Sequence, residues 1–288
     1  MPFPEMGISW QLWHNQPPAN RRHVTDSAKT TDPPGTKSLN FSYLAVPVRR
    51  EILLLPGMKV IFEDNHIIAV NKECGEIVMV DQTGDTPLVD AVKAYLKEKY
   101  NKPGEVFLGL PHRIDRPTSG IVLMARTSKT LARFNKMFQS REEIRKIYWA
   151  VVDHLPEPRQ GTLEHWISRS TEKNKSYAHT FRAFDSKHAL LNYRTLASSD
   201  NYHLLEIELL TGRHHQIRAQ LAKIGVHIKG DLKYGFPRSN HDGGIHLHAR
   251  RVEFLHPVRR EPVVITAAPP DDPLWNAFLS LIPEGMPA

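Results

Sequence analysis

Residues 112–120, HRIDRPTSG, hold the first side chains whose types and spacing could do chemistry. Asp115 lies between Arg113 and Arg116, and His112 precedes them. Flanking cations favour the ionised form of a carboxylate, and the proline and glycine of this segment indicate a constrained loop. A rigidly held carboxylate of this kind suits a nucleophile or a general base. Taken alone, such a segment is more simply explained by a salt bridge or an Asx turn.

A second group lies in residues 209–221, LLTGRHHQIRAQL. The pattern predicts a strand, a turn and a helix, which places Arg213 and His214 near a helix N-terminus, where backbone N–H groups and the helix dipole favour a phosphate. Arg218 follows His214 by one turn and can lie away from the apolar side of the helix. If it is buried it needs a carboxylate partner, and Asp115 is available. A solvent-facing basic helix is the alternative.

Residues 146–148, KIY, belong to a β-branched and aromatic run that predicts a strand over 144–152. On a strand Ile147 and Tyr148 face opposite sides, so one of them leaves the core or lines a cleft. A tyrosine in a cleft can stack on a nucleobase. A core tyrosine with a satisfied hydroxyl is the alternative.

The histidines of residues 245–257, IHLHARRVEFLHP, raise the question of a metal. His246 and His248 would share a strand face, with His256 beyond them, but a metal site needs further ligands and a supporting shell. Such ligands are suggested only by closeness in sequence: His227, Asp231 and Asp242. The sequence has no HExxH, CxxC or P-loop pattern. We therefore expect no metal, and a metal-dependent hydrolase remains a minor alternative.

The spacing of apolar residues predicts the elements that must position these groups. Strands outnumber helices and strict βαβ alternation is absent, which indicates an α+β fold. We expect a single catalytic domain over 46–271, built on a large mixed or antiparallel sheet flanked by helices. A flexible N-terminal arm over 1–45 and a short C-terminal helix and tail over 272–288 complete the chain. The expected strands cover 60–62, 66–70, 121–125, 144–152, 204–210, 246–255 and 262–267.

The chain has 288 residues, a formal net charge of +7 and a single cysteine, Cys74. The positive balance favours a polyanionic partner such as RNA, DNA or an anionic membrane. One cysteine excludes an internal disulfide, which agrees with a reducing compartment. No apolar run reaches the roughly 20 residues of a membrane span, and no signal-peptide pattern opens the chain. We expect a cytoplasmic protein.

These segments occur in an order that resembles the RluA-type pseudouridine synthases. HRIDRPTSG, IRKIYWAVV and LLTGRHHQIRAQL are followed by HIKGDLKYG and LHARRVEFLHP, and VIFEDNHIIAVNKECGEIV resembles the family's opening hairpin. The resemblance covers roughly residues 58–270. It implies an enzyme that isomerises uridines of ribosomal or transfer RNA by breaking the glycosidic bond and rejoining the base through C5, without metal or cofactor.

The resemblance also implies roles for particular residues. Asp115 would be the catalytic aspartate, Tyr148 would lie against the target base, and Arg218 would pair with Asp115. RNA contacts are expected from five residues: His112, Arg113, Arg116, Arg213 and His214. RNA is the expected partner, the protein is expected to be a monomer without an obligate protein partner, and no membrane association is expected. A non-catalytic RNA-binding protein on the same scaffold is the main alternative, although such a relative should have lost Asp115, Tyr148 or Arg218.

Overall fold

The computed structural model describes residues 52–53, 58–80, 84–140 and 143–282. The predicted arm over 1–45 and residues 283–288 of the predicted tail lie outside these ranges. All described residues fall within one compact unit, residues 43–288.

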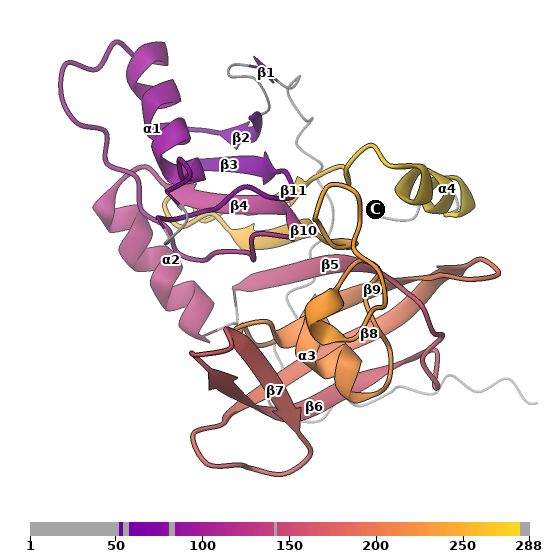
Figure 1. Cartoon of the computed structure of the whole chain (residues 1–288). Helices are drawn as coiled ribbons and strands as arrows, with labels where there is room; N and C mark the ends of the chain where they lie inside the picture. The colour runs from indigo at the N-terminus through magenta and orange to yellow at the C-terminus, as the bar shows by residue number, and fades with distance from the viewer. Residues whose placement is uncertain (1–51, 54–57, 81–83, 141–142, 283–288) are drawn as a thin grey trace, which may run out of the picture. The chain divides into compact units, whose positions relative to one another are not determined.

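One sheet organises the described chain (Figure 1). Its strand order is β1-β2-β3-β4-β10-β5-β9-β8-β6-β7, and β11 pairs with β10. All pairings are antiparallel except that of β10 with β4, so the sheet is mixed and the predicted α+β class is confirmed. The strands are β1 Ile52–Leu53, β2 Lys59–Glu63, β3 Ile67–Lys72, β4 Ser119–Ala125, β5 Ile144–Val152, β6 Gln160–Ser170, β7 Lys175–His179, β8 Lys187–Ser198, β9 His203–Leu209, β10 Leu247–Leu255 and β11 Pro262–Thr266.

Three strands in the middle of the chain, β6, β7 and β8, were not predicted. β6 and β7 do not give a clean apolar alternation, and in β8 the inward row Ala189, Leu191 and Tyr193 is obscured by Leu190 on the other face. In β6 the residue between the inward Leu163 and Ile167 on the same face is His165, whose Nδ1 lies 3.2 Å from Nε2 of Gln220. β7 is a short edge strand made mostly of polar residues. A strand with a satisfied polar group in its core-facing row does not show the period-2 apolar pattern that marks most strands.

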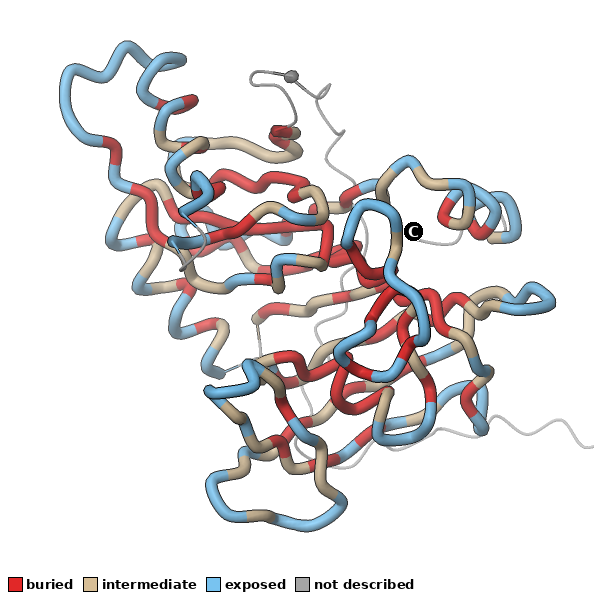
Figure 2. Tube along the Cα trace, in the orientation of Figure 1, coloured by how far each residue is buried: buried red, intermediate tan, exposed pale blue. Residues whose placement is uncertain are grey.

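Four helices and a short 3₁₀ turn pack on the sheet: α1 Leu88–Lys99, α2 Ser128–Ser140, α3 Gln216–Lys223, η1 Leu232–Tyr234 and α4 Pro273–Leu281. α1 and α2 share one buried cluster with β3 and β4, whereas α3 packs on β5, β8 and β9 in a second cluster. Figure 2 shows the buried strands under the exposed loops and helix faces. Tyr148 on β5 packs against both clusters, so it lies at the seam between them.

The start of β4 is held closely against β10. Gly120 has φ +111°, and a Cβ there would lie 2.4 Å from the carbonyl oxygen of Ala249, so only glycine fits. One residue earlier, the Ser119 Oγ lies 2.9 Å from Nδ1 of His248, and Nε2 of His248 donates to the carbonyl of Ala267 at 3.1 Å. These contacts fix the point where the chain leaves the 112–118 loop.

His248 predicts an acid sensitivity of folding. It is fully buried, and burial lowers its pKa from 6.5 to about 3. Because the unfolded chain takes up the proton first, the stability is present above pH 6.5 and is lost as the pH falls toward 3, at about 1.4 kcal/mol per pH unit. Urea unfolding at pH 7, 6 and 5 should show that the free energy of unfolding falls less steeply with decreasing pH in His248→Gln than in wild type. Equal slopes would show that His248 is protonated within the fold.

Candidate active site

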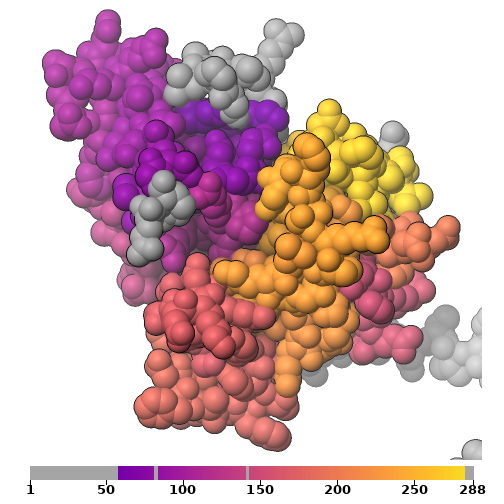
Figure 3. Space-filling view, in the orientation of Figure 1, coloured from indigo at the N-terminus to yellow at the C-terminus, as the bar shows by residue number. Residues whose placement is uncertain are grey.

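A pocket of about 540 Å³ lies between the two buried clusters, in the roughly 300–1,000 Å³ range of small-molecule sites. Three segments supply its wall: residues 111–118 before β4, β5, and residues 209–218 up to the first turn of α3. Figure 3 shows this face of the molecule hollowed between its purple and its red-orange parts. Segments far apart in the sequence therefore converge at one site.

The structure brings seven of the eight predicted site residues to the pocket wall: His112, Arg113, Asp115, Tyr148, Arg213, His214 and Arg218. Within the described chain, Arg116 is the one predicted residue that is not part of this wall. Its exposed guanidinium instead pairs with Asp85, with Nη2 to Oδ2 at 2.6 Å. A contact between Arg116 and a ligand in the pocket would require this surface pair to open.

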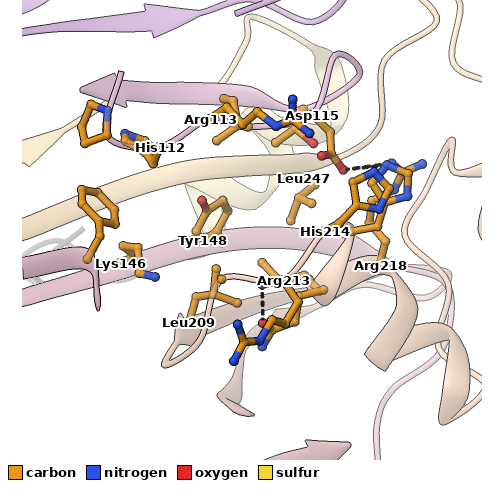
Figure 4. Close-up of a pocket in the computed structure, with 18 of the residues that line it drawn as sticks. His112, Arg113, Asp115, Lys146, Tyr148, Leu209, Arg213, His214, Arg218 and Leu247 are labelled. Atoms are coloured by element: carbon orange, nitrogen blue, oxygen red, sulfur yellow. Dashed lines mark hydrogen bonds and ion pairs between the residues drawn. The ribbon is translucent and has the colours of Figure 1, made fainter. Parts of the chain in front are cut away.

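Asp115 and Arg218 form an ion pair at the pocket wall (Figure 4). Nη1 of Arg218 donates to Oδ2 of Asp115 at 3.0 Å, and the Asp115 side chain keeps 27% of its surface exposed. Arg218 is only 5% exposed. The carboxylate is therefore reachable from the pocket, while the cation that neutralises it lies behind it.

Asp231 fixes the guanidinium of Arg218 from the other side. Nε and Nη2 of Arg218 donate to the two carboxylate oxygens of Asp231 at 2.7 and 2.8 Å, and Asp231 is 1% exposed. The guanidinium also lies 4.9 Å from the ring centroid of Tyr234. Burial alone would lower the pKa of Arg218, but the hydrogen bonds and charges of Asp231 and Asp115 raise it. The two hydrogen bonds to Asp231 hold the guanidinium in an orientation in which Nη1 points at Asp115.

No local sequence pattern indicates this role of Asp231, for which the sequence suggests only a possible metal ligand. It follows Arg218 by thirteen residues, a spacing without a helical or strand period. Asp231 precedes the turn η1, whose Tyr234 stacks on the same guanidinium. The GDLKY segment thus supplies both supports of Arg218 from one short turn.

Two stacked histidines precede α3. The rings of His214 and His215 lie 3.8 Å apart, and Nδ1 of His214 lies 2.9 Å from Oγ of Ser176 on β7. His215 has a left-handed backbone, φ 52°, and its Nδ1 meets the Tyr234 hydroxyl at 3.0 Å. Burial, together with Arg218 and other nearby cations, lowers the pKa of His215 to about 2. His215 therefore meets Asp115, at 3.5 Å, as a neutral ring.

The turn before α3 is tied to β8. Gln216 accepts from the Thr211 hydroxyl at 2.6 Å and from the backbone N–H of Arg213 at 2.9 Å, and it donates to the carbonyl of Leu190 at 3.1 Å. Nε of Arg213 donates to the carbonyl of His188 at 2.9 Å. The predicted phosphate-binding residues thus lie on a fixed turn at the pocket edge.

His112 and Lys72 hold the loop that carries Asp115. Nε2 of His112 accepts from the Leu123 N–H at 2.9 Å, and burial with the nearby Lys146 lowers the pKa of His112 to about 3. Lys72, fully buried, donates to the carbonyls of Glu73, Glu76 and Arg116 at 2.8, 2.9 and 3.1 Å. Both side chains support the backbone on either side of Asp115, so His112 holds the loop in addition to lining the pocket.

Tyr148 places its ring in the pocket wall opposite the 111–118 loop (Figure 4). Burial and the charge of Asp115 raise the pKa of Tyr148, so its hydroxyl is neutral at physiological pH. Lys146, two residues earlier on the same face of β5, also lines the pocket. The alternative of a sealed core tyrosine does not hold, because the ring borders open space.

The histidine-rich strand uses its ring nitrogens within the protein. His246 meets Asn240 through Nδ1 at 2.9 Å and Asp272 through Nε2 at 3.1 Å, and His248 bonds at both nitrogens as described above. Among the described residues, three other side chains bring possible ligand atoms within 4.8 Å of one another: Asp153, His154 and His227. Their hydrogen bonds connect the end of β5 with residue 227, and none of them lines the pocket.

Comparison with known proteins identifies the family. Residues 66–223 match the model of the RNA pseudouridylate synthase family. A relative from Zymomonas mobilis named ribosomal large subunit pseudouridine synthase D is 30% identical over 249 residues, 82% of this chain and 78% of that relative. An uncharacterised RNA pseudouridine synthase of Bacillus subtilis is 32% identical over 229 residues, 78% of this chain and 74% of that relative.

A solved structure shows the same fold. Human RNA pseudouridylate synthase domain containing 4 matches with a TM-score of 0.63 and 23% identity, over 76% of this chain and 91% of that one. Fold and family match together define an RNA-modifying isomerase. The chain belongs to the RNA pseudouridine synthase family, which confirms the resemblance drawn from the motifs. None of the helices in the described part of the chain has the length and apolar character needed to cross a bilayer.

Proposed function

We propose that this protein converts specific uridines of ribosomal or transfer RNA to pseudouridine, with Asp115 as the catalytic carboxylate. The N1–C1′ bond breaks, the uracil turns, and a C5–C1′ bond forms. The proton on C5 is released and N1 takes up a proton, so the composition of the RNA is unchanged. The observation that supports this role is the ion pair of Asp115 with Arg218 in a pocket whose lining residues, except Leu247, fall within the segment that matches the family.

The geometry supports a separate role for each of several pocket residues within this proposal. Asp115 presents a partly exposed carboxylate either to C1′ as a nucleophile or to a ribose proton as a base, and Arg218 holds that carboxylate in place through the ion pair. The ring of Tyr148 offers a face for the uracil. Arg213 and His214, on the turn before α3, are placed for a phosphate. These contacts must offset the cost of flipping the uridine out of its stack, a few kcal/mol.

The test follows the proton that leaves C5. RNA transcribed with uridine tritiated at C5 should release tritium to water when incubated with the purified protein. Mapping pseudouridine in total RNA from the host with and without the gene should then show which sites disappear. An active, folded preparation that releases no tritium from host RNA lacking these modifications would contradict the proposal.

Tyr148 is expected to act through its ring more than through its hydroxyl. Tyr148→Ala should lower turnover by about 100-fold or more, because the uracil loses the stacking face. Tyr148→Phe keeps that face and should lose less, because the neutral hydroxyl cannot serve as a base near pH 7. Single-turnover rates of the two variants provide the measurement. A Phe variant as slow as the Ala variant would assign the chemistry to the hydroxyl.

A further inference from the structure

An aromatic loop joins β7 to β8 at some distance from the pocket. Phe181 and Phe184 are 82% and 97% exposed there, although aromatic rings of this size are normally at least partly buried. Both the backbone N–H and the hydroxyl of Ser186 donate to the carbonyl of Ala183, and Asp185 adopts φ 51°. This turn fixes the backbone around Phe184, so the ring is presented to solvent by an ordered loop.

Further aromatic and cationic groups lie beside this loop. The guanidinium of Arg182 lies 5.4 Å from the ring centroid of Trp166 on β6, and the ammonium of Lys175 lies 5.8 Å from that of Tyr177, which is 39% exposed. We call Trp166, Tyr177, Phe181, Arg182 and Phe184 the aromatic patch. Scattered exposed apolar residues are ordinary, but rings gathered with cations over them are a pattern that nucleobases fit.

The charge around the aromatic patch is positive. Five cations lie between the start of β6 and the start of β8: Arg169, Lys173, Lys175, Arg182 and Lys187. Three carboxylates lie in the same stretch, Glu164, Glu172 and Asp185, and that of Glu164 is paired with His188 at 2.8 Å. A polyanion that also presents flat rings is therefore the complementary partner, and RNA has both features.

β7 connects the aromatic patch to the pocket. At its first residues, Ser176 bonds His214 of the pocket wall, and the ammonium of Lys175 lies 5.0 Å from the ring centroid of Tyr234. After Ser176 the strand continues for three residues, roughly 10 Å, toward the 180–186 loop (Figure 1). Phe181 and Phe184 follow the end of this strand and are not part of the pocket wall, so they can contact the same RNA a few nucleotides from a base in the pocket.

We propose that the aromatic patch binds unpaired nucleotides that flank the uridine held in the pocket, with bases stacked on Phe181 and Phe184. The inference rests on the proposed function, because it takes RNA as the substrate. It adds a requirement on that substrate: the RNA beside the target must be single-stranded, since bases within a duplex have no free face for these rings. Arg182 and the neighbouring lysines would meet the phosphates of the same stretch.

Binding measurements on the double variant Phe181→Ala/Phe184→Ala test this inference. The probes are a fluorescein-labelled 12-nucleotide uridine-rich RNA and a blunt 12-base-pair RNA duplex, measured by anisotropy at one salt concentration. The double variant should bind the single strand about tenfold or more weakly, because alanine removes both stacking faces, and the duplex within about twofold of wild type. The matched control Phe107→Ala, a 47% exposed ring before β4, should leave both affinities unchanged.

Unchanged affinity for the single strand would overturn the inference, as would an equal loss for strand and duplex, which would show that the lost contact does not depend on unpaired bases. Normal RNA binding together with a change in self-association by sedimentation would assign the aromatic patch to a protein contact instead. The same measurements in an Asp115→Asn background need no turnover. Failure of the proposed isomerisation is thereby separated from failure of the patch to bind RNA.

Discussion

Asp115→Asn is expected to reduce pseudouridine formation by about 10⁴-fold, the upper end of what one acid–base group supplies, while folding and RNA affinity stay near wild type. The substitution keeps the size of the side chain and removes its charge. Since Asp115 is 27% exposed and Arg218 remains paired with Asp231, no uncompensated buried charge results. Tritium release under single-turnover conditions measures the rate. Thermal unfolding checks that the variant is folded, and fluorescence anisotropy with labelled RNA checks its RNA affinity.

A matched control removes a different carboxylate that pairs with an arginine of the same loop. Asp85→Asn breaks the surface pair with Arg116 outside the pocket, and it should leave turnover within a few-fold of wild type. Asp115→Ala extends the test, because an alanine offers no oxygen at all. Substantial turnover by a well-folded Asp115→Ala protein would remove Asp115 from the chemistry.

Two residues of the site were predictable because they lie on regular, strongly patterned segments, whereas those of the 112–118 loop and of the turn before α3 were predicted from their motifs. Tyr148 lies on an apolar strand of nine residues, and Arg218 lies one turn into a helix, so the periodicity of each segment sets where the side chain can point. The RNA contact of Arg116 was predicted from its place beside Asp115 and from the family resemblance, and a loop residue has no such period. Its actual direction depends on Asp85, a partner thirty-one residues away.

Apart from the pair of Asp115 with Arg218, which the family resemblance implied, long-range polar contacts could not be predicted. Asp231 and Tyr234 meet Arg218 because the bridge of Ile228 with β5 and the turn η1 bring them there, and no local pattern encodes that meeting. The strand β6 was missed for a related reason, since His165 in its inward row is satisfied by Gln220 on α3. Apolar burial repeats along the chain, whereas buried polar partners are specified by the tertiary structure.

Arg218→Leu is expected to lose both stability and activity. It leaves Asp231, 1% exposed, without its cation, and removing one partner of a buried pair typically costs 3–5 kcal/mol of the free energy of unfolding. Asp115 also loses its cation, so turnover should fall by about 100-fold or more. The control Arg194→Leu breaks the pair with Glu206, in which the arginine side chain is 47% exposed, and should cost at most about 1 kcal/mol.

A double substitution separates the two effects of Arg218. Arg218→Leu/Asp231→Leu leaves no buried charge, so it should recover much of the stability lost in Arg218→Leu. Activity should not return, because Asp115 still has no cation behind it. Asp231→Asn keeps Arg218 but replaces the two-oxygen fork by a single acceptor oxygen, which frees the guanidinium to turn away from Asp115. The turnover of Asp231→Asn should fall clearly, whereas its free energy of unfolding should fall less than that of Arg218→Leu. Full turnover in this variant would show that Arg218 holds Asp115 without help from Asp231.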